Sequence, residues 1–180
     1  ESVSRMAKNF IISDRKYFAG MIDGDGTITF RLPKNRPSLK LMITLGLRYD
    51  HAEPVLKLAE LFDLTVFKKI FLIAQGNTQP SLMCNLSGIR AKLFLFSIYP
   101  YLLEKKEKAR QILLSQGCPE EHLPKERQFS FEYLAGYTDA EGSAVFTLRH
   151  EKTKRGNITS SYKMRYILCS NDNAHLQFIK

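Results

Sequence analysis

The sequence predicts an α+β protein made of two related halves, each with a helix followed by antiparallel strands. The stretch FAGMIDGDG at residues 18–26 returns as LAGYTDAEG at residues 134–142, and a helix-like lead precedes each copy. A strand pattern follows each copy, because polar and apolar residues alternate over 27–32 and 143–149. The copies stand 116 residues apart, which is too long for a solenoid repeat and fits a duplicated small domain.

Composition narrows the classes of function. The chain of 180 residues is 44% hydrophobic, which is enough to bury a core. Its net charge of +9 favours a polyanionic partner such as nucleic acid, and no run of 18 apolar residues predicts a membrane span. Three cysteines without a CxxC pair argue against a disulfide framework or a cysteine zinc site and fit a reducing, intracellular compartment. The first residues show no signal-peptide core.

The first half, residues 1–116, is expected to have the element order α-β-β-α-β-β-α-α. Its second strand alternates most clearly, with an apolar face over 39–47 and a polar face from Lys40 to Arg48, and a turn at 33–37 precedes it. We expect Asp50 to cap a helix over 50–62 that tolerates Pro54 in its first turn. Strands near 64–74 and 81–87, a turn at 75–80, and helices over about 88–97 and 102–116 complete this half.

The second half repeats this order only in part. A loop rich in Gly and Pro at 117–129 links the halves, and residues 130–180 then predict a helix, two strands and a helix opening at 171–180. The first half uses about twice as many residues for its complete unit. We therefore expect the second half to be incomplete and to be completed by a second chain or by a further segment.

The repeated motif places small residues in the last turns of a helix. Gly20 and Gly24 lie four residues apart, as do Gly136 and Ala140. Small residues at this spacing let two helix backbones approach closely. Such an approach would offset the cost of about 1 kcal/mol that a glycine carries in a helix interior. The motif therefore predicts that the two helices pack against each other.

The acids of the motif predict a metal site. If the two helices pack side by side, Asp25 and Glu141 come together at their C-terminal ends, where carboxylates are unfavourable and repel each other. A divalent cation resolves this conflict, and with oxygen ligands alone Mg²⁺ or a similar hard cation fits. A calcium EF-hand does not fit, because Ile28 and Lys34 stand where that loop requires Gly and Glu.

Both motifs resemble those of the LAGLIDADG homing endonucleases, in the single-chain form with two motifs. The eighth position is acidic in each copy, and the order of elements around the first copy agrees with that family. The resemblance implies a saddle of two antiparallel sheets over double-stranded DNA, with the motif helices at the interface. It implies that Asp25 and Glu141, with Gly24 and Ala140 beside them, bind the Mg²⁺ ions that drive cleavage of both strands. The stretch YPYLLEKKEKA at 99–109 resembles the segment that closes a half-domain and makes Lys105 the lysine of the catalytic pocket.

The resemblance also implies that polar strand faces read bases in the major groove, while loop residues contact phosphates. The expected base-reading residues are Thr27, Thr29, Arg31, Lys40, Thr44, Arg48, Arg149, Lys163 and Arg165. The expected phosphate contacts are Lys34, Arg36, Lys152, Lys154 and Arg155. A polar pocket residue is expected late in the second strand of each half, near Leu47 and Arg48 and near Ser170 and Asn171.

The function implied is a site-specific, divalent-metal-dependent, double-strand DNA endonuclease associated with an intron or intein, in an organelle or in the cytoplasm of a microbe. The alternative is a non-cleaving nucleic-acid-binding protein on the same fold, an RNA maturase or a DNA-binding regulator, because fold does not fix function. A purely structural dimerisation domain would leave the net charge and the polar strand faces unexplained.

Overall fold

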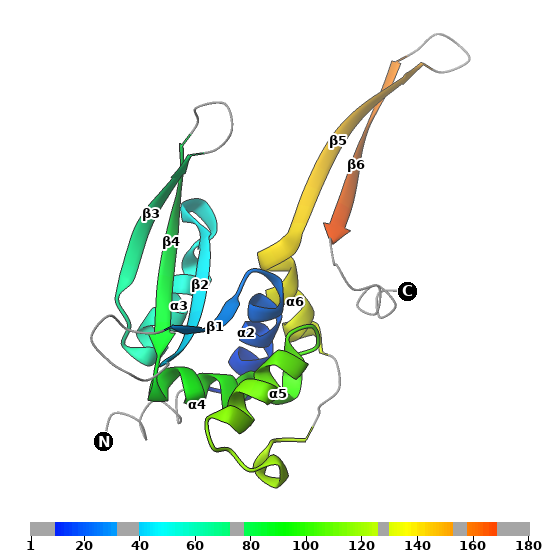
Figure 1. Cartoon of the computed structure of the whole chain (residues 1–180). Coiled ribbons are helices and arrows are strands. Elements are labelled where there is room, and N and C mark those ends of the chain that lie inside the picture. Colours follow the sequence, from blue (N-terminus) through cyan, green and yellow to red (C-terminus); the bar gives the residue numbers. More distant parts are fainter. Residues whose placement is uncertain (1–9, 32–39, 73–77, 126–129, 153–157, 169–180) are drawn as a thin grey trace. The chain divides into compact units, whose positions relative to one another are not determined.

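The computed structural model describes residues 10–31, 40–72, 78–125, 130–152 and 158–168 (Figure 1). Contacts divide the chain into two compact units, Glu1–Ala140 and Glu141–Lys180. The elements before the second sheet, the last of which ends one residue past the boundary, are α2 (Ile12–Gly24), β1 (Thr27–Arg31), β2 (Lys40–Arg48), η1 (Tyr49–His51), α3 (Glu53–Phe62), β3 (Val66–Leu72), β4 (Thr78–Ser87), α4 (Ile89–Ile98), η2 (Tyr99–Tyr101), α5 (Lys106–Ser115), η3 (Glu120–His122) and α6 (Phe131–Glu141). Their order confirms the α-β-β-α-β-β-α-α prediction for the first half.

The first unit is built on a four-stranded antiparallel sheet with the strand order β1-β2-β4-β3. In β2 every second residue from Leu41 to Leu47 is buried, as the period of two predicted. Helices α3 and α4 contact β2 and β4. Four phenylalanines, Phe10, Phe18, Phe62 and Phe94, form a core cluster with ring centroids 5.4–6.3 Å apart. The sheet thus has one apolar face in the core and one outer face on which polar residues such as Thr44 and Arg48 lie together with the exposed Phe67.

Strand β4 starts earlier than predicted. The expected turn at 75–80 is wrong over its last residues, because Thr78 to Pro80 already pair with β3. Pro80 is tolerated since the pairing of β4 with β2 stops at Ser81, so the missing N–H of the proline interrupts no bond to β2.

Helix α3 is not capped by Asp50 as expected. It starts at Glu53 with Ala52 as its N-cap residue, no side-chain cap hydrogen bond, and Pro54 in the first turn as predicted. The Asp50 carboxylate instead accepts hydrogen bonds from Nε and Nη2 of Arg48, at 3.2 and 2.7 Å. A guanidinium fork two residues away therefore competes successfully for the capping carboxylate.

The last helix of the first half is shorter than expected. α5 starts at Lys106, whereas the sequence predicted a helix from residue 102. Residues 102–105 form a turn instead, because the backbone N–H groups of 103–105 donate to the carboxylate of Asp23 in α2.

The two motif helices α2 and α6 lie side by side and touch through their backbones (Figure 1). A Cβ atom added to Gly20 would lie 2.1 Å from the carbonyl oxygen of Tyr133, and one added to Gly136 would lie 1.9 Å from that of Tyr17. Tyr17 and Tyr133 hold matching positions before their motifs, so the contact is reciprocal. The close helix approach predicted from the small residues is confirmed at this pair of glycines.

The described part of the second unit consists of two strands. β5 (Gly142–Lys152) and β6 (Ile158–Leu168) pair antiparallel, from Gly142 opposite Leu168 to Lys152 opposite Ile158. The expected helix at 171–180 and the turn residues 153–157 lie outside the described residues. Within the described part of the chain, none of the helices combines the length and the apolar character that crossing a membrane requires.

Alanine at either crossing glycine should destabilise the protein. We expect Gly20→Ala and Gly136→Ala each to lower the free energy of unfolding by about 2 kcal/mol or more, because the new methyl group meets backbone that cannot move aside. Urea unfolding followed by circular dichroism measures this. Ala135→Ser adds one atom to the exposed side of α6 and should change little. Equal losses in all three variants would contradict the close crossing.

Candidate functional site

Asp25 stands at the C-terminal end of α2 and opens onto the polar face of the sheet. It is the C-cap residue of the helix, and its side chain is exposed. A cavity of about 330 Å³ lies beside it, lined by Asp25, Thr27, Thr44, Gly46, Leu47, Arg48, Ser81 and Met83. Partial loss of hydration raises the pKa of Asp25 above its usual value, and the nearby Lys105 ammonium offsets this rise only in part. The motif acid of the first half is thus accessible and lies at the edge of a hollow in the sheet.

Lys105 closes the end of the same helix. Its Nζ donates to the carbonyl oxygens of Ile22, Asp23 and Gly24 at 2.6, 2.8 and 2.8 Å. The last carbonyls of a helix have no partner within it and carry its negative partial charge. An ammonium group here is favourable because it donates hydrogen bonds to these carbonyls and also neutralises their charge. The Gly24 carbonyl, expected as a metal ligand, is one of the three oxygens that Lys105 binds. Lys105 therefore lies at the predicted site, at the backbone of the helix end.

Asp23 is a buried anchor to which sequence reasoning gave no role. Its side chain is 1% exposed and accepts backbone N–H bonds from Leu103, Glu104 and Lys105, at 2.7, 3.3 and 2.8 Å. The hydroxyl of Tyr133 in α6 donates to it at 2.8 Å. Burial raises the pKa of Asp23, and these donors lower it. The carboxylate thus holds the turn that carries Lys105 against α2.

The second motif repeats half of this arrangement. Tyr17 donates to the Asp139 carboxylate at 2.6 Å, as Tyr133 does to Asp23. Asp139 and Asp23 occupy the sixth position of their motifs, and each is bound by the tyrosine that precedes the other motif. The acid at the sixth position of both motif copies is the sequence signal from which this reciprocal pairing could have been predicted. Unlike Asp23, Asp139 is exposed.

The polar face of the sheet collects part of the expected DNA-binding set. Thr27, Thr44 and Arg48 line the cavity beside Asp25. In register, Thr29 pairs with Met42 and Arg31 with Lys40. Sequence reasoning missed three residues of β4 on this face: Ser81 and Met83 line the cavity, and Asn85 accepts a bond from the Thr44 hydroxyl at 2.7 Å. The alternation of these residues along β4 could be read from the sequence, but the pairing of β4 with β2 could not.

The remaining expected residues fall into three groups. Glu141 is placed at the end of α6, the residues of the second sheet are placed by their strand pairing alone, and the others lie outside the described ranges. Glu141 is exposed and ends α6. In the second sheet, Val145 pairs with Arg165, Thr147 with Lys163, Arg149 with Ser161, and Lys152 with Ile158. The residues Lys34, Arg36, Lys154, Arg155, Ser170 and Asn171 lie outside the described ranges. Among the described residues, no group of three or more His, Cys, Asp or Glu side chains could hold a metal ion.

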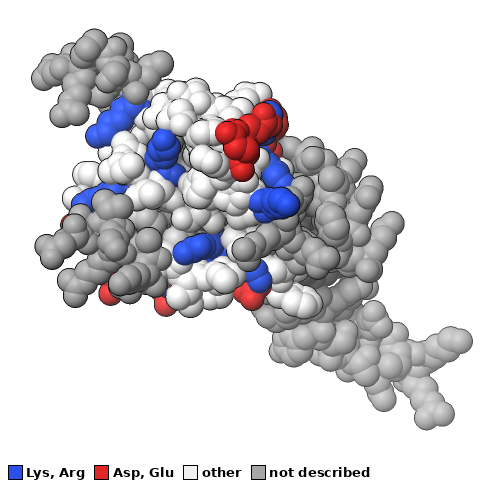
Figure 2. All heavy atoms as spheres, turned by 90° about the horizontal axis from the view of Figure 1, so that it is seen from below, with Lys and Arg blue, Asp and Glu red and all other residues white. Residues whose placement is uncertain are grey.

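Basic charge does not gather on the face formed by the bottom of the first unit. Figure 2 shows this face with Lys and Arg side chains spaced over a largely uncharged surface, while acidic side chains lie toward its rim, with the largest group at the upper right. The described residues seen there therefore form no basic groove. The net charge of +9 supports DNA binding only if it acts elsewhere on the chain.

Asp23 and Asp139 provide a matched pair of substitutions. We expect Asp23→Asn to lower the free energy of unfolding by about 1–3 kcal/mol, because one backbone N–H would face an amide N–H in a buried place. Asp139→Asn should cost less than about 1 kcal/mol, since this residue is exposed and Tyr17 can still donate to the amide oxygen. Thermal and urea unfolding compare the two variants. Equal losses would show that Asp23 does not hold the Leu103–Lys105 turn.

Comparisons with known proteins identify the fold. No protein-family model and no curated protein sequence matches the chain. The meganuclease I-AabMI bound to uncleaved DNA is similar at 14% identity and a TM-score of 0.53, over 86% of this chain and 66% of that one. I-CpaMI bound to uncleaved DNA is similar at 10% and 0.53, over 92% and 73%, and I-SmaMI bound to cleaved DNA at 15% and 0.52, over 83% and 64%. This chain thus spans about two thirds of the length of these structures. Its fold is that of the LAGLIDADG homing endonucleases, the family that the two motifs predicted.

Proposed function

We propose that this chain is part or all of a site-specific DNA endonuclease that needs a divalent metal ion and cuts both strands. The observation that carries the proposal is the position of Asp25. An exposed carboxylate ends a motif helix and opens into a cavity in the polar face of an antiparallel sheet. Metal-assisted phosphodiester hydrolysis needs such an acid next to a surface that binds DNA.

The donor set at Asp25 fits a hard cation. The accessible carboxylate stands at the negative end of α2, and Glu141 ends α6 in the same way. Asp25 and Glu141 would hold the ion, and DNA phosphate and water would supply the other oxygens, as Mg²⁺ commonly requires. When bound, such an ion supplies Lewis-acid stabilisation of the charge that develops on the phosphate.

The residues of this chain then bind and orient the DNA. Thr27, Thr44 and Arg48 surround the cavity at which Asp25 opens, so a phosphate or base edge held there would meet the carboxylate. Lys105 acts as a positioning residue, because it binds the carbonyls that immediately precede Asp25. The solved structures of this fold in complex with DNA support double-stranded DNA as the partner.

Neutral isosteres of the two motif acids test the reaction. We expect Asp25→Asn and Glu141→Gln each to reduce cleavage of the target by about a hundredfold or more in the presence of Mg²⁺, because the ion loses a charged ligand. DNA binding, measured by fluorescence anisotropy, should persist. The target is found by selecting cleaved sites from a random DNA library.

Glu60→Gln is the matched control, since it removes one carboxylate from an exposed site on α3. It should cleave like the unchanged protein. Full cleavage by both acid variants would overturn the endonuclease proposal. Tight nucleic-acid binding by the unchanged protein with no cut in any selected DNA would instead favour the non-cleaving maturase or regulator.

Arg48 should contribute to DNA affinity. Arg48→Ala removes a guanidinium from the cavity rim, and we expect the Kd for target DNA to rise by roughly 5- to 150-fold, which corresponds to about 1–3 kcal/mol. If Arg48 binds phosphate, the slope of log affinity against log salt falls by about 1; if it reads a base, the loss depends on sequence. Arg110→Ala on α5, a partly exposed arginine paired with Glu120, is the control. Unchanged affinity in Arg48→Ala would remove the cavity from the DNA interface.

A further inference from the structure

The outer face of the first sheet carries an apolar row that crosses three strands. Gly46 of β2 pairs with Met83 of β4, and Met83 pairs with Phe67 of β3. Directly paired residues of antiparallel strands project from the same face of a sheet. Gly46 and Met83 line the cavity beside Asp25, so Phe67 lies on the same face as that cavity. The row therefore belongs to the surface on which DNA is proposed to bind.

Gly46 makes room for Met83 in the middle of this row. A Cβ atom added to Gly46 would lie 2.9 Å from Cγ of Met83, so the methionine side chain leans over the place where a side chain of β2 would stand. Methionine suits such a gap because it is unbranched and flexible. The cavity beside Asp25 thus has an apolar wall at Met83, within reach of a group that enters from outside the sheet.

Phe67 extends the apolar row to the edge of the sheet. Its side chain is 50% exposed, and β3 is the edge strand. Ile70 lies three residues further along the same strand and is 61% exposed, but it projects from the opposite face because side chains alternate along a strand. A single exposed apolar side chain needs no explanation, whereas one that continues an apolar wall offers a contact surface.

Polar rows flank the apolar row on both sides. Arg48 pairs with Ser81 and Ser81 with Lys69 on one side, while Thr44 pairs with Asn85 on the other and donates to its side-chain oxygen at 2.7 Å. Successive rows on one face are two residues, or about 7 Å, apart along a strand. Two cations next to an apolar contact are complementary to DNA, which presents phosphates around base edges.

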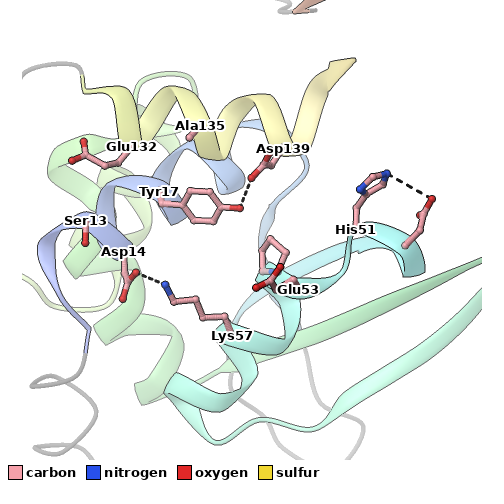
Figure 3. A pocket seen from close by; sticks show the side chains of 11 residues that line it. Ser13, Asp14, Tyr17, His51, Glu53, Lys57, Glu132, Ala135 and Asp139 are labelled. Carbon is pink, nitrogen blue, oxygen red and sulfur yellow. Dashed lines mark hydrogen bonds and ion pairs between the residues drawn. The ribbon is translucent and has the colours of Figure 1, made fainter. Parts of the chain in front are cut away.

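A larger cavity of the first unit is unsuitable for DNA. It has a volume of about 580 Å³ and is walled by α2, η1, α3 and α6. Its walls carry the carboxylates of Asp14, Asp50, Glu53, Glu132 and Asp139. Figure 3 shows Lys57 bound to Asp14 and Tyr17 bound to Asp139. A phosphate in this cavity would meet carboxylates of its own charge, so the outer face of the sheet is the better place for DNA.

We propose that Met83 and Phe67 recognise the methyl group of a thymine in the major groove. Thymine presents an apolar group there, its C5 methyl, and apolar side chains distinguish it by contact. The proposal adds an apolar, base-specific contact to the polar residues expected to read bases. It rests on the proposed function for its partner, double-stranded DNA, but not on cleavage.

Replacing thymine by uracil tests the contact, because uracil lacks only the methyl group. Duplexes that bind the protein are selected from a random DNA library, and each thymine of a selected site is replaced in turn by deoxyuridine. We expect the Kd, measured by fluorescence anisotropy, to rise about fourfold at one position, the factor that corresponds to burying one methyl group. Phe67→Ala should bind the thymine and uracil duplexes of that position equally, whereas Phe67→Leu, which keeps an apolar side chain, should retain part of the difference.

Ile70→Ala is the matched control, since it shortens an equally exposed apolar side chain of β3 on the opposite face. It should keep the fourfold difference. The proposal is overturned if no thymine position depends on its methyl group, or if Phe67→Ala retains the full dependence. Methyl-dependent binding of DNA that is never cut would reject the endonuclease and keep this contact, while cleavage that ignores the methyl group would do the reverse. Failure to bind any duplex would reject both.

Discussion

The contact on which the rest of the first unit depends is the backbone crossing of α2 and α6. Two glycines, Gly20 and Gly136, leave no room even for a methyl group, so the spacing of the helices is set by carbonyl and amide atoms. Glycine costs about 1 kcal/mol in each helix. Backbone contact fixes position more firmly than side chains do, because it cannot adopt another rotamer. The reciprocal bonds of Tyr17 and Tyr133 to the opposite acids then fix the rotation of each helix.

Asp23 and Asp25 are only two residues apart, yet they have different roles because the crossing fixes which side of α2 faces the protein interior. Residues i and i+2 lie on nearly opposite sides of a helix. Asp23 therefore points into the protein, where four donors surround it, while Asp25 points to the cavity at the sheet. A buried carboxylate is tolerable only when it is fully hydrogen-bonded, and such a group is unavailable to a ligand. The reverse holds for Asp25, whose exposure makes it the acid that can bind a cation.

The fold was largely predictable from periodicity, whereas the contacts of the site were not. The alternation from Leu41 to Leu47 and the small residues of the motif act locally, so their pattern carries the prediction. The turn at 102–105 reads as helix because nothing nearby forbids it, and it is Asp23, about 80 residues earlier, that takes its N–H groups. Ser81 and Met83 reach the cavity only through the pairing of β4 with β2, which follows no local rule. Asp50 failed as a cap because Arg48 competes for it.

The environment of Lys105 explains how a lysine can matter to the site without touching substrate. Three carbonyl oxygens converge on its Nζ at 2.6–2.8 Å, a geometry that suits the tetrahedral ammonium group. Arginine presents its donors in one plane and would not match three converging oxygens, so even this substitution is not conservative. The ammonium also neutralises the negative end of α2 next to Asp25 and lowers the pKa of that acid. Lys105 thereby opposes the rise in the pKa of Asp25 that desolvation causes, and it holds the end of the helix that carries this acid.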